Sequence, residues 1–539
     1  MDNRRGPRNA RAGRFMIFGF GIVLLILAAA CDGQGSAASS AQDNPPDSAA
    51  TTSGAAQSSS DSPSSPVRLL KTQPEKGLIG ETFTMTGDGL PPNKAVDFVW
   101  ITVEGSYDLR VKPDNVEFYE PLFEEAQLPL GRVNTDGEGR VQATFQVPED
   151  FGEIHDIYGL VDGERVAKGG YRVLRQVRIE PTEGPVGTPI TVTVEGMGWK
   201  PVEAKMALRY DNQFTGFVSA ITTRGTATAV LRAAGPAGMH SIEMSGTGVN
   251  GGGYLNNQQS PYAHIYPENG AFSFWFRVTG DDGAPPDTFD WPDRDRVKQL
   301  DASDPITTSA GPTVSDGATV SLDRSSGPIA TDVNVRGSRL QANAEFDLVW
   351  GGILADNLGT PGWDRVPQKN LQQNSFGKFS SDGNGNLTAG FEVPDELGGW
   401  HAIQLVGQDG AIAAEGKFFV ERSLVSVSAR QAKAGVSITI EVKGIGWTDI
   451  DNGFAVTYDN AFFGYACGFN SGGTIILHLP VTGEPGTHLI DLYPMTHLRS
   501  TGKPGWVYSM PQLTFRQDHP GLSVGYNVPA IRLAIEVIE

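Results

Sequence analysis

Six residues in two Tyr-Asp-Asn triplets are the strongest candidates for a ligand-contacting site in this 539-residue chain. The first triplet is Tyr210, Asp211 and Asn212, and the second is Tyr458, Asp459 and Asn460. Asp and Asn are disfavoured within β-strands unless a turn or a ligand uses their oxygens. Aromatic residues follow each triplet, so an aromatic surface edged by a carboxylate and a carboxamide could bind a sugar face or a peptide. The alternative is an Asx turn between two strands, with the aromatic rings in the core.

Four histidines occupy one repeated position, and each is followed two residues later by Ile. They are His155, His240, His401 and His488. One histidine in each of four separate domains cannot surround a metal ion, so we expect each ring to hydrogen-bond backbone or cap a sheet edge. The D-x-D-x-D-G calcium spacing and Cys-rich zinc spacings are absent from the sequence. The sequence therefore predicts no metal site and no cofactor.

No catalytic motif is present. G-x-S-x-G, H-E-x-x-H, Walker A and the dinucleotide fingerprint are missing from the contexts in which they would function. Cys467 is a candidate nucleophile, but the sister repeat has Ser219 at the same position, so we expect Cys467 to be a small buried residue. Carboxylates in the acidic insertion 117–125 could be paired for glycosidase chemistry, but their spacing alone does not indicate it. The sequence predicts a protein that is not an enzyme.

The charge of the chain limits its partners. Beyond residue 30, the chain has 37 basic and 61 acidic side chains, a net charge near −24. A field of this sign repels phosphate backbones, so we expect no nucleic-acid partner. Only two cysteines are present, so no disulfide framework stabilises the chain, and each domain must gain its stability by burying apolar surface.

The candidate residues lie within four related repeats. Each repeat has an alternating apolar strand that leads into a Gly-containing turn, and these strands begin near residues 83, 190, 333 and 438. Gly196–His240 aligns without a gap on Gly444–His488, with 15 of 45 residues identical. The first and third repeats share Asp-Phe-Val-Trp at 97–100 and Asp-Leu-Val-Trp at 347–350. A two-domain unit was therefore duplicated as a block.

Period-two alternation and turn signals every 8–12 residues predict an all-β fold. We expect four tandem immunoglobulin-like antiparallel β-sandwich domains, arranged as two duplicated pairs. The predicted domains cover residues 67–175, 176–280, 316–421 and 422–539. Residues 281–315 are rich in Asp and Pro and are predicted to be a linker. If the side chain of Trp291 packed on a neighbouring domain, this linker would be ordered.

Several motifs resemble bacterial immunoglobulin-like domains of the TIG/IPT kind. They are the stretch Pro-Thr-Glu-Gly-Pro-Val-Gly-Thr at 181–188, the turn Gly196-x-Gly198-Trp199, and the hairpins at 136–148 and 382–394. The resemblance covers most of residues 67–539. It implies the sandwich fold and carries no activity with it.

The N-terminus has the composition of an export signal. Five arginines precede the uncharged stretch Phe15–Ala30, which ends in small residues directly before Cys31. Residues 1–30 are predicted to be a signal peptide. Its last residues together with Cys31 are similar to a bacterial lipobox, and this similarity implies that Cys31 is lipid-modified. An uncleaved membrane helix and a plain secreted protein are the alternatives. Residues 31–66 are rich in Ser, Ala and Pro, so they are predicted to be a flexible tether.

These features together indicate a lipid-anchored protein on the outer side of the cell membrane, at the cell surface. We expect its domains to act as a binding, adhesion or spacer module whose partner is a protein or glycan of the cell envelope. The alternative is a lipoprotein that binds a carbohydrate or peptide for a transport or polysaccharide-processing system.

Overall fold

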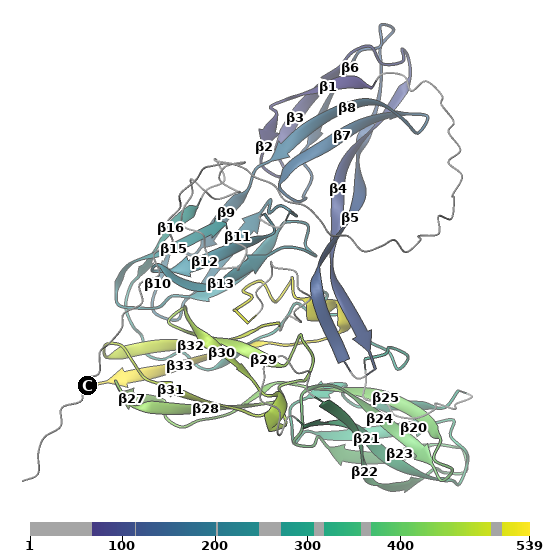
Figure 1. Cartoon of the computed structure of the whole chain (residues 1–539), viewed down its shortest axis with the longest axis vertical. Helices are drawn as coiled ribbons and strands as arrows, with labels where there is room; N and C mark the ends of the chain where they lie inside the picture. Colours follow the sequence, from purple (N-terminus) through teal and green to yellow (C-terminus); the bar gives the residue numbers. More distant parts are fainter. Residues whose placement is uncertain are drawn as a thin grey trace, which may run out of the picture. The chain divides into compact units, whose positions relative to one another are not determined.

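β-Strands that pair mostly antiparallel build all four repeats of the chain, and each repeat also has a short parallel pairing (Figure 1). The structure is a computed structural model, and it describes residues 67–113, 115–200, 203–246, 271–306, 317–356, 368–496 and 509–539. Among these residues, two short 3-10 helices interrupt the strands, η2 (Phe469–Ser471) and η3 (Pro520–Val524). Within these ranges, no helix is long and apolar enough to cross a membrane. Cys31 and the predicted tether lie outside the described residues.

We number the sandwiches 1 to 4 in chain order, and sandwiches 1 and 3 share one strand order. In sandwich 1 the path is β5-β4-β7-β8-β1-β3-β6, with β2 paired to β8. In sandwich 3 the sheet β19-β25-β24-β21-β22 packs on β18-β20-β23. The strands of sandwich 1 are β1 (Arg68–Gln73), β2 (Lys76–Gly77), β3 (Thr82–Gly87), β4 (Ala95–Lys112), β5 (Asn115–Asn134), β6 (Val141–Gln146), β7 (Glu153–Val161) and β8 (Glu164–Val173). Those of sandwich 3 are β18 (Thr319–Leu322), β19 (Ser326–Gly327), β20 (Asp332–Ser338), β21 (Glu345–Asp356), β22 (Gln368–Ser380), β23 (Leu387–Glu392), β24 (Gly399–Gly407) and β25 (Ile412–Val420).

Sandwiches 2 and 4 share a second strand order. In sandwich 2 the sheet β10-β16-β15-β12-β13 packs on β14-β11-β9, and in sandwich 4 the sheet β17-β33-β32-β29-β30 packs on β26-β28-β31, with β27 paired to β33. The strands of sandwich 2 are β9 (Gln176–Glu180), β10 (Glu183–Gly184), β11 (Pro189–Glu195), β12 (Lys205–Tyr210), β13 (Gln213–Ser219), β14 (Ala227–Arg232), β15 (Gly238–Gly246) and β16 (Phe272–Val278). Those of sandwich 4 are β26 (Ser423–Val427), β27 (Gln431–Lys433), β28 (Ser437–Lys443), β29 (Gly453–Tyr458), β30 (Ala461–Cys467), β31 (Ile475–Pro480), β32 (Gly486–Pro494) and β33 (Ala530–Ile538), together with β17 (Thr288–Asp290).

The predicted fold class is confirmed. The apolar residues of β11 that alternate in the sequence, Ile190, Val192 and Val194, are all fully buried between the two sheets of sandwich 2. Opposed antiparallel sheets bury one face of each strand, which is the reason that the alternation is visible in the sequence. The same strand order in alternate sandwiches confirms that the unit of duplication is a pair.

The long hairpin β4–β5 extends from sandwich 1 to sandwich 4. Its tip residues Val116 and Phe118 are buried in an apolar cluster with Ile450. The Phe118 amide donates to a carboxylate oxygen of Asp449 at 3.2 Å, and the Asp449 amide donates to the Val116 carbonyl at 3.1 Å. The hairpin therefore joins the first sandwich to the last.

Part of the predicted linker is a strand of sandwich 4. β17 pairs antiparallel with β33, and the Arg430 guanidinium donates to the Asp287 carboxylate at 2.8 Å just before it. Trp291 stacks on Phe289 of β17, with ring centroids 6.2 Å apart. The aromatic residue noted in the sequence thus lies within an ordered segment.

A buried ion network joins sandwich 2 to sandwich 4. The carboxylate of Asp491 accepts a hydrogen bond from Arg232 of sandwich 2 and lies 3.2 Å from an Nη of Arg532. Arg532 also bonds Asp290 of β17 at 3.0 Å and lies over the Tyr493 ring. All three members of the central group, Arg232, Asp491 and Arg532, are buried. The core of sandwich 2 consequently continues into sandwich 4, whereas the sequence predicts separate cores.

A second buried carboxylate strengthens the same interface. Asp518, in the segment between β32 and β33, is fully buried. It accepts from the Ser219 hydroxyl at 2.7 Å, from the Ile221 amide at 2.9 Å, and from the Thr222 amide and hydroxyl at 2.9 Å each. A carboxylate with four donors offsets its own desolvation, so this segment is held against sandwich 2.

Asp491→Ala should lower the stability of the folded chain by about 3 kcal/mol, because it leaves the buried Arg232 guanidinium without its counter-charge and leaves Arg532 with Asp290 alone. Asp97→Ala is the matched control, since it removes an ion pair with Arg132 in which both partners are exposed, and it should lower the stability much less than Asp491→Ala. The midpoints of urea unfolding measure both effects. Equal midpoints for the two variants would contradict the buried network.

Candidate functional site

Each pair of sandwiches has the same junction. The ring of Trp199 packs on His155 with centroids 5.1 Å apart, and Trp447 packs on His401 at 5.3 Å. Both tryptophans follow the Gly-x-Gly turn that marks the second sandwich of a pair. The repeated motif therefore places an aromatic ring of one sandwich on a histidine of the sandwich before it.

Glycines allow the two backbones to approach at each junction. The amide of Gly152 donates to Met197 at 2.9 Å, and the amide of Gly398 donates to Ile445 at 2.9 Å. A Cβ atom on Gly152 would lie 1.9 Å from a carbonyl oxygen of the next sandwich, and one on Gly398 would lie 2.0 Å from its equivalent. No side chain fits there, so this spacing fixes the two sandwiches of each pair against each other.

The junction histidines bond backbone, as the sequence predicts. His155 stacks on Trp100, and its ring nitrogens lie 2.9 and 2.8 Å from the carbonyl oxygens of Ile101 and Phe151. His401 makes the same contacts with Trp350 and with two carbonyl oxygens at 2.8 and 2.9 Å. Both ring nitrogens of each histidine are used in this way, so neither ring is arranged for proton transfer to a substrate.

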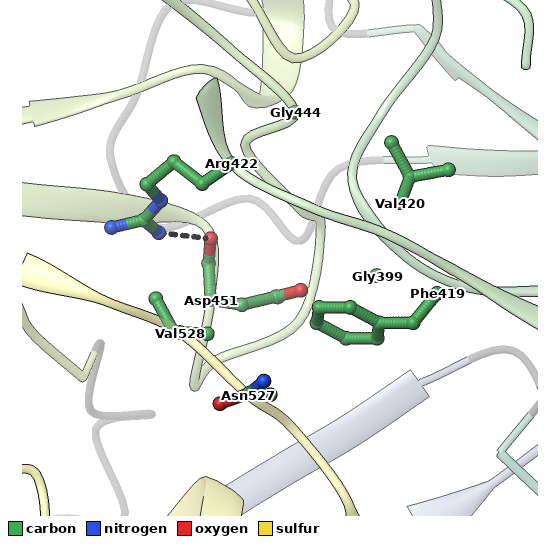
Figure 2. Close-up of a pocket in the computed structure, with 8 residues that line it drawn as sticks. All are labelled: Gly399, Phe419, Val420, Arg422, Gly444, Asp451, Asn527 and Val528. Atoms are coloured by element: carbon green, nitrogen blue, oxygen red, sulfur yellow. Dashed lines mark hydrogen bonds between the residues drawn. The ribbon is translucent and has the colours of Figure 1, made fainter. Parts of the chain in front are cut away.

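A small polar cavity lies at the junction of sandwiches 3 and 4 (Figure 2). Its space is about that of one water molecule. The Arg422 guanidinium is buried beside it, and one Nη donates to the carbonyl oxygens of Asp451 at 3.2 Å and Gly453 at 3.0 Å. The other lining residues are Gly399, Phe419, Val420, Gly444, Asn527 and Val528. A sugar or peptide does not fit this space.

Burial determines the charge properties of this junction. It lowers the pKa of Arg422 to about 10 and that of the nearby His519 to about 3. His519 is therefore neutral in the folded chain, and its Nδ1 accepts from the Gly521 amide at 3.1 Å. Arg422 retains its charge at neutral pH. The group resembles a buried polar contact between domains more closely than a catalytic centre.

The junction of sandwiches 1 and 2 fills the equivalent space differently. Glu153 is at the position of Gly399, and both have a left-handed backbone, with φ of 77° and 96°. The Glu153 carboxylate accepts from Arg172 at 3.1 Å, where sandwich 3 has Phe419 packed on Tyr526. An ion pair in one junction thus corresponds to two aromatic rings in the other. The shared backbone geometry supports a structural role for both.

The two Tyr-Asp-Asn triplets form tight hairpin turns. Asp211 and Asn212 have φ of 45° and 63°, and Asp459 and Asn460 have 48° and 64°. Two successive residues with positive φ are typical of a type I′ turn, which Asp and Asn tolerate better than other residues. The fold thus accounts for these residue types as turn formers.

Each triplet also holds the histidine of its own sandwich. A carboxylate oxygen of Asp211 lies 2.6 Å from Nδ1 of His240, and Asp459 makes the same 2.6 Å contact with His488. The tyrosine rings stack on these histidines, and their hydroxyls donate to backbone carbonyls of Ala234 and Thr482 at 2.8 and 2.6 Å. These side chains are therefore used within each sandwich.

Only part of the predicted site is accessible. Asp211 and Asn212 are exposed, but Tyr210 and Asn460 are buried, and Tyr458 and Asp459 are half-buried. The Asn460 amide donates to the Arg232 carbonyl at 2.8 Å, so this turn contacts sandwich 2. The aromatic residues Phe214 and Phe462 that follow the triplets meet edge to face, with centroids 6.3 Å apart. Ligand binding by the six triplet residues stays a prediction.

Cys467 is exposed, so the prediction of a small buried residue is wrong. It lies on the edge strand β30, where alternate side chains point outward. Its sister Ser219 is buried because the Asp518 segment covers it. Among the described residues, no three His, Cys, Asp or Glu side chains are grouped as metal ligands.

The residues that fix the junctions were not singled out from the sequence. Arg175 and Arg422 each follow the last strand of a first sandwich, and both guanidiniums donate to backbone of the second sandwich. The Val-x-Arg pattern shared by residues 173–175 and 420–422 could have paired these two arginines. No shared pattern could have identified Asp518 in the same way. It lies in a segment whose counterpart in sandwich 2 lies outside the described residues.

Glu203→Gln should raise the melting temperature at pH 7.5. Burial raises the pKa of Glu203, and the nearby Glu153 carboxylate raises it further, although Lys200 opposes this change. One of its carboxylate oxygens is buried without a hydrogen-bond partner among the residues that the structure describes. A carboxyl group with a raised pKa destabilises the fold when it is ionised. The increase in melting temperature caused by Glu203→Gln should therefore become smaller as the pH falls, because Glu203 of the parent chain then takes up its proton.

Calorimetry at pH 7.5 and pH 5 measures this difference. Glu195→Gln is the control, because Glu195 pairs with Arg178 on the surface. A lower melting temperature for Glu203→Gln at both pH values would show that the charged carboxylate stabilises the junction.

His488→Asn should destabilise the chain more at pH 5.5 than at pH 8.5. The hydrogen bond to Asp459 raises the pKa of His488, so the folded state binds a proton more tightly than the unfolded state. This stabilisation is complete below the unfolded pKa and is lost as the pH rises through the folded pKa. Melting temperatures across this range measure it, and Asp459→Asn should remove the same pH dependence. A pH-independent effect of His488→Asn would contradict the prediction.

Comparison with known proteins identifies no family. No family model and no curated protein match the chain. Among solved structures, the native E. coli alpha-2-macroglobulin is 9% identical over 86% of this chain, with a TM-score of 0.16, and this chain spans 30% of its length. The ICAM-5 D1–D4 ectodomain fragment is 12% identical over 83% of this chain and 99% of its own length, with a TM-score of 0.16. The assignment of the fold depends on the strand order described above.

Proposed function

We propose that this protein is a non-enzymatic cell-envelope lipoprotein, anchored through Cys31, that presents a rigid assembly of immunoglobulin-like sandwiches on the outer side of the membrane. The observation that carries the proposal is the repeated junction, in which Gly152 and Gly398 fix the two sandwiches of each pair. A protein that must hold a binding surface at a set position requires fixed domain contacts, whereas an enzyme also requires a reactive cleft.

The contacts between the two pairs support the same function. Asp491 and Asp518 fix sandwich 4 to sandwich 2, and the tip of the β4–β5 hairpin contacts Asp449 of sandwich 4. Because each contact buries charged or hydrogen-bonded groups, moving one sandwich would leave these groups unpaired at a cost of several kcal/mol. The folded part would therefore act as one spacer or binding body, and the partner would be a protein or glycan of the envelope.

The predicted anchor and tether complement this body. An acylated Cys31 would hold the chain at the membrane, and 35 residues of Ser-, Ala- and Pro-rich sequence would give a reach of roughly 30 Å. This reach would allow the folded part to meet partners beyond the lipid headgroups.

Cys31→Ser should move the protein from the membrane fraction to the soluble fraction, because it removes the thiol that carries the lipid. Incorporation of a labelled fatty acid and fractionation of the bacterial expression host measure this change. Cys467→Ser is the matched control and should stay in the membrane fraction with its label. A membrane-bound, unlabelled Cys31→Ser protein would instead indicate an uncleaved helix, and a wild-type protein in the medium would indicate plain secretion.

A further inference from the structure

Sandwiches 2 and 4 contact each other through two different surfaces. Sandwich 2 contributes the outer edge of β14, which we call the β14 surface (Thr228, Val230 and Arg232). The Val230 carbonyl accepts from Tyr493 at 3.5 Å and from Arg532 at 3.4 Å, and Arg232 binds Asp491. Sandwich 4 contributes the outer face of β32 and β33, which we call the β33 surface. It consists of Leu489, Asp491, Arg532 and Ala534, which pair across the two strands.

Because the sandwiches are duplicated, each of these two surfaces has a counterpart at the equivalent position of the other sandwich. We call this counterpart its sister surface. At the spacing of 248 residues between the copies, the sisters of Thr228, Val230 and Arg232 are Ile476, His478 and Pro480, which form the β31 surface of sandwich 4. The sisters of Leu489 and Asp491 are Ser241 and Glu243. Trp275 lies opposite Ser241, just as Ala534 lies opposite Leu489. With Met239, these residues form the β16 surface of sandwich 2.

These two sister surfaces expose large apolar side chains. Trp275 is 61% exposed and Met239 is 55% exposed, whereas Leu489 and Ala534 at the occupied β33 surface are 1% and 3% exposed. On the β31 surface, Ile476 is 56% exposed. An exposed tryptophan beside a methionine is typical of a protein-binding surface.

We propose that the β31 surface of one molecule binds the β16 surface of a second copy of this chain. The contact would repeat between molecules the contact that sandwiches 2 and 4 make within one molecule. In sandwich 4, β31 belongs to the sheet β26-β28-β31, and the β33 surface belongs to the opposite sheet. The β31 surface is therefore separate from the occupied β33 surface. Since the two binding surfaces differ and belong to different sandwiches, the contact is heterologous, and it builds rows or rings of molecules instead of a closed dimer.

The residues that differ between sister surfaces adjust the strength of this contact. Pro480 replaces Arg232, and Glu243 is paired with Arg209 at 2.9 Å, so the buried ion pair of the internal contact is not repeated. Trp275 replaces Ala534, and Ile476 replaces Thr228, which adds apolar area. The contact between molecules is therefore more apolar and more easily reversed than the internal one. It would suit chains that are concentrated on a membrane, but it does not depend on the anchor.

The test is sedimentation velocity of the exported chain carrying Cys31→Ser, as a concentration series up to about 100 µM, where a weak contact is measurable. We expect oligomers that grow with concentration. Trp275→Ala and Ile476→Thr, which introduce the sister residues, should each weaken association at least about tenfold. Ile154→Thr is the matched control, because Ile154 is also a β-strand isoleucine with 56% exposure, and it should associate like the parent chain.

A mixture of the two variants gives the sharper result. Trp275→Ala retains the β31 surface, and Ile476→Thr retains the β16 surface, so together they should form one-to-one dimers that cannot extend. Met239→Thr replaces Trp275→Ala if that variant does not fold, as judged by its melting temperature. A monomeric parent chain, an equal effect of Ile154→Thr, or a mixture that remains monomeric would each overturn the proposal.

Discussion

The buried carboxylate of Asp491, between the guanidinium groups of Arg232 and Arg532, is the interaction on which the arrangement of the two pairs depends. A lone carboxylate in this position would be strongly unfavourable, and two lone guanidiniums would be more so. Arg232 and Asp491 therefore depend on each other, while Arg532 is also paired with Asp290 of β17. The network makes the docked state of sandwiches 2 and 4 specific, because a small shift leaves a charge without its partner.

The junctions within each pair depend on close backbone approach instead of charge. Gly152 and Gly398 keep the carbonyl of the following sandwich at a distance that no Cβ atom allows. The side chains around this contact have diverged, as Glu153 and Gly399 show, while the backbone hydrogen bond is the same in both pairs. The geometry of the contact has therefore been retained through changes in the residues that fill it.

Much of the fold could be predicted from the sequence, because its determinants are local. The alternation of Ile190, Val192 and Val194 indicates a strand with one buried face. The repetition of whole segments indicates that the sandwiches occur as two duplicated pairs. The contacts between sandwiches could not be predicted, since they join residues such as Arg232 and Asp491 whose sequence context is unremarkable. The triplets were identified correctly as unusual, but the sequence left a turn and a ligand site as alternatives. The φ angles show that the turn accounts for the residue types.

The β4–β5 hairpin has a consequence for the order in which the chain folds. Its tip bonds Asp449, which lies 331 residues later in the sequence, and it packs with Val524 and Tyr526 near the C-terminus. Contacts of such sequence separation form late, because a long loop must close before they are made. During synthesis the hairpin tip would emerge long before its binding site exists. Its apolar residues would remain open to chaperones or to neighbouring chains until synthesis of the chain is nearly complete.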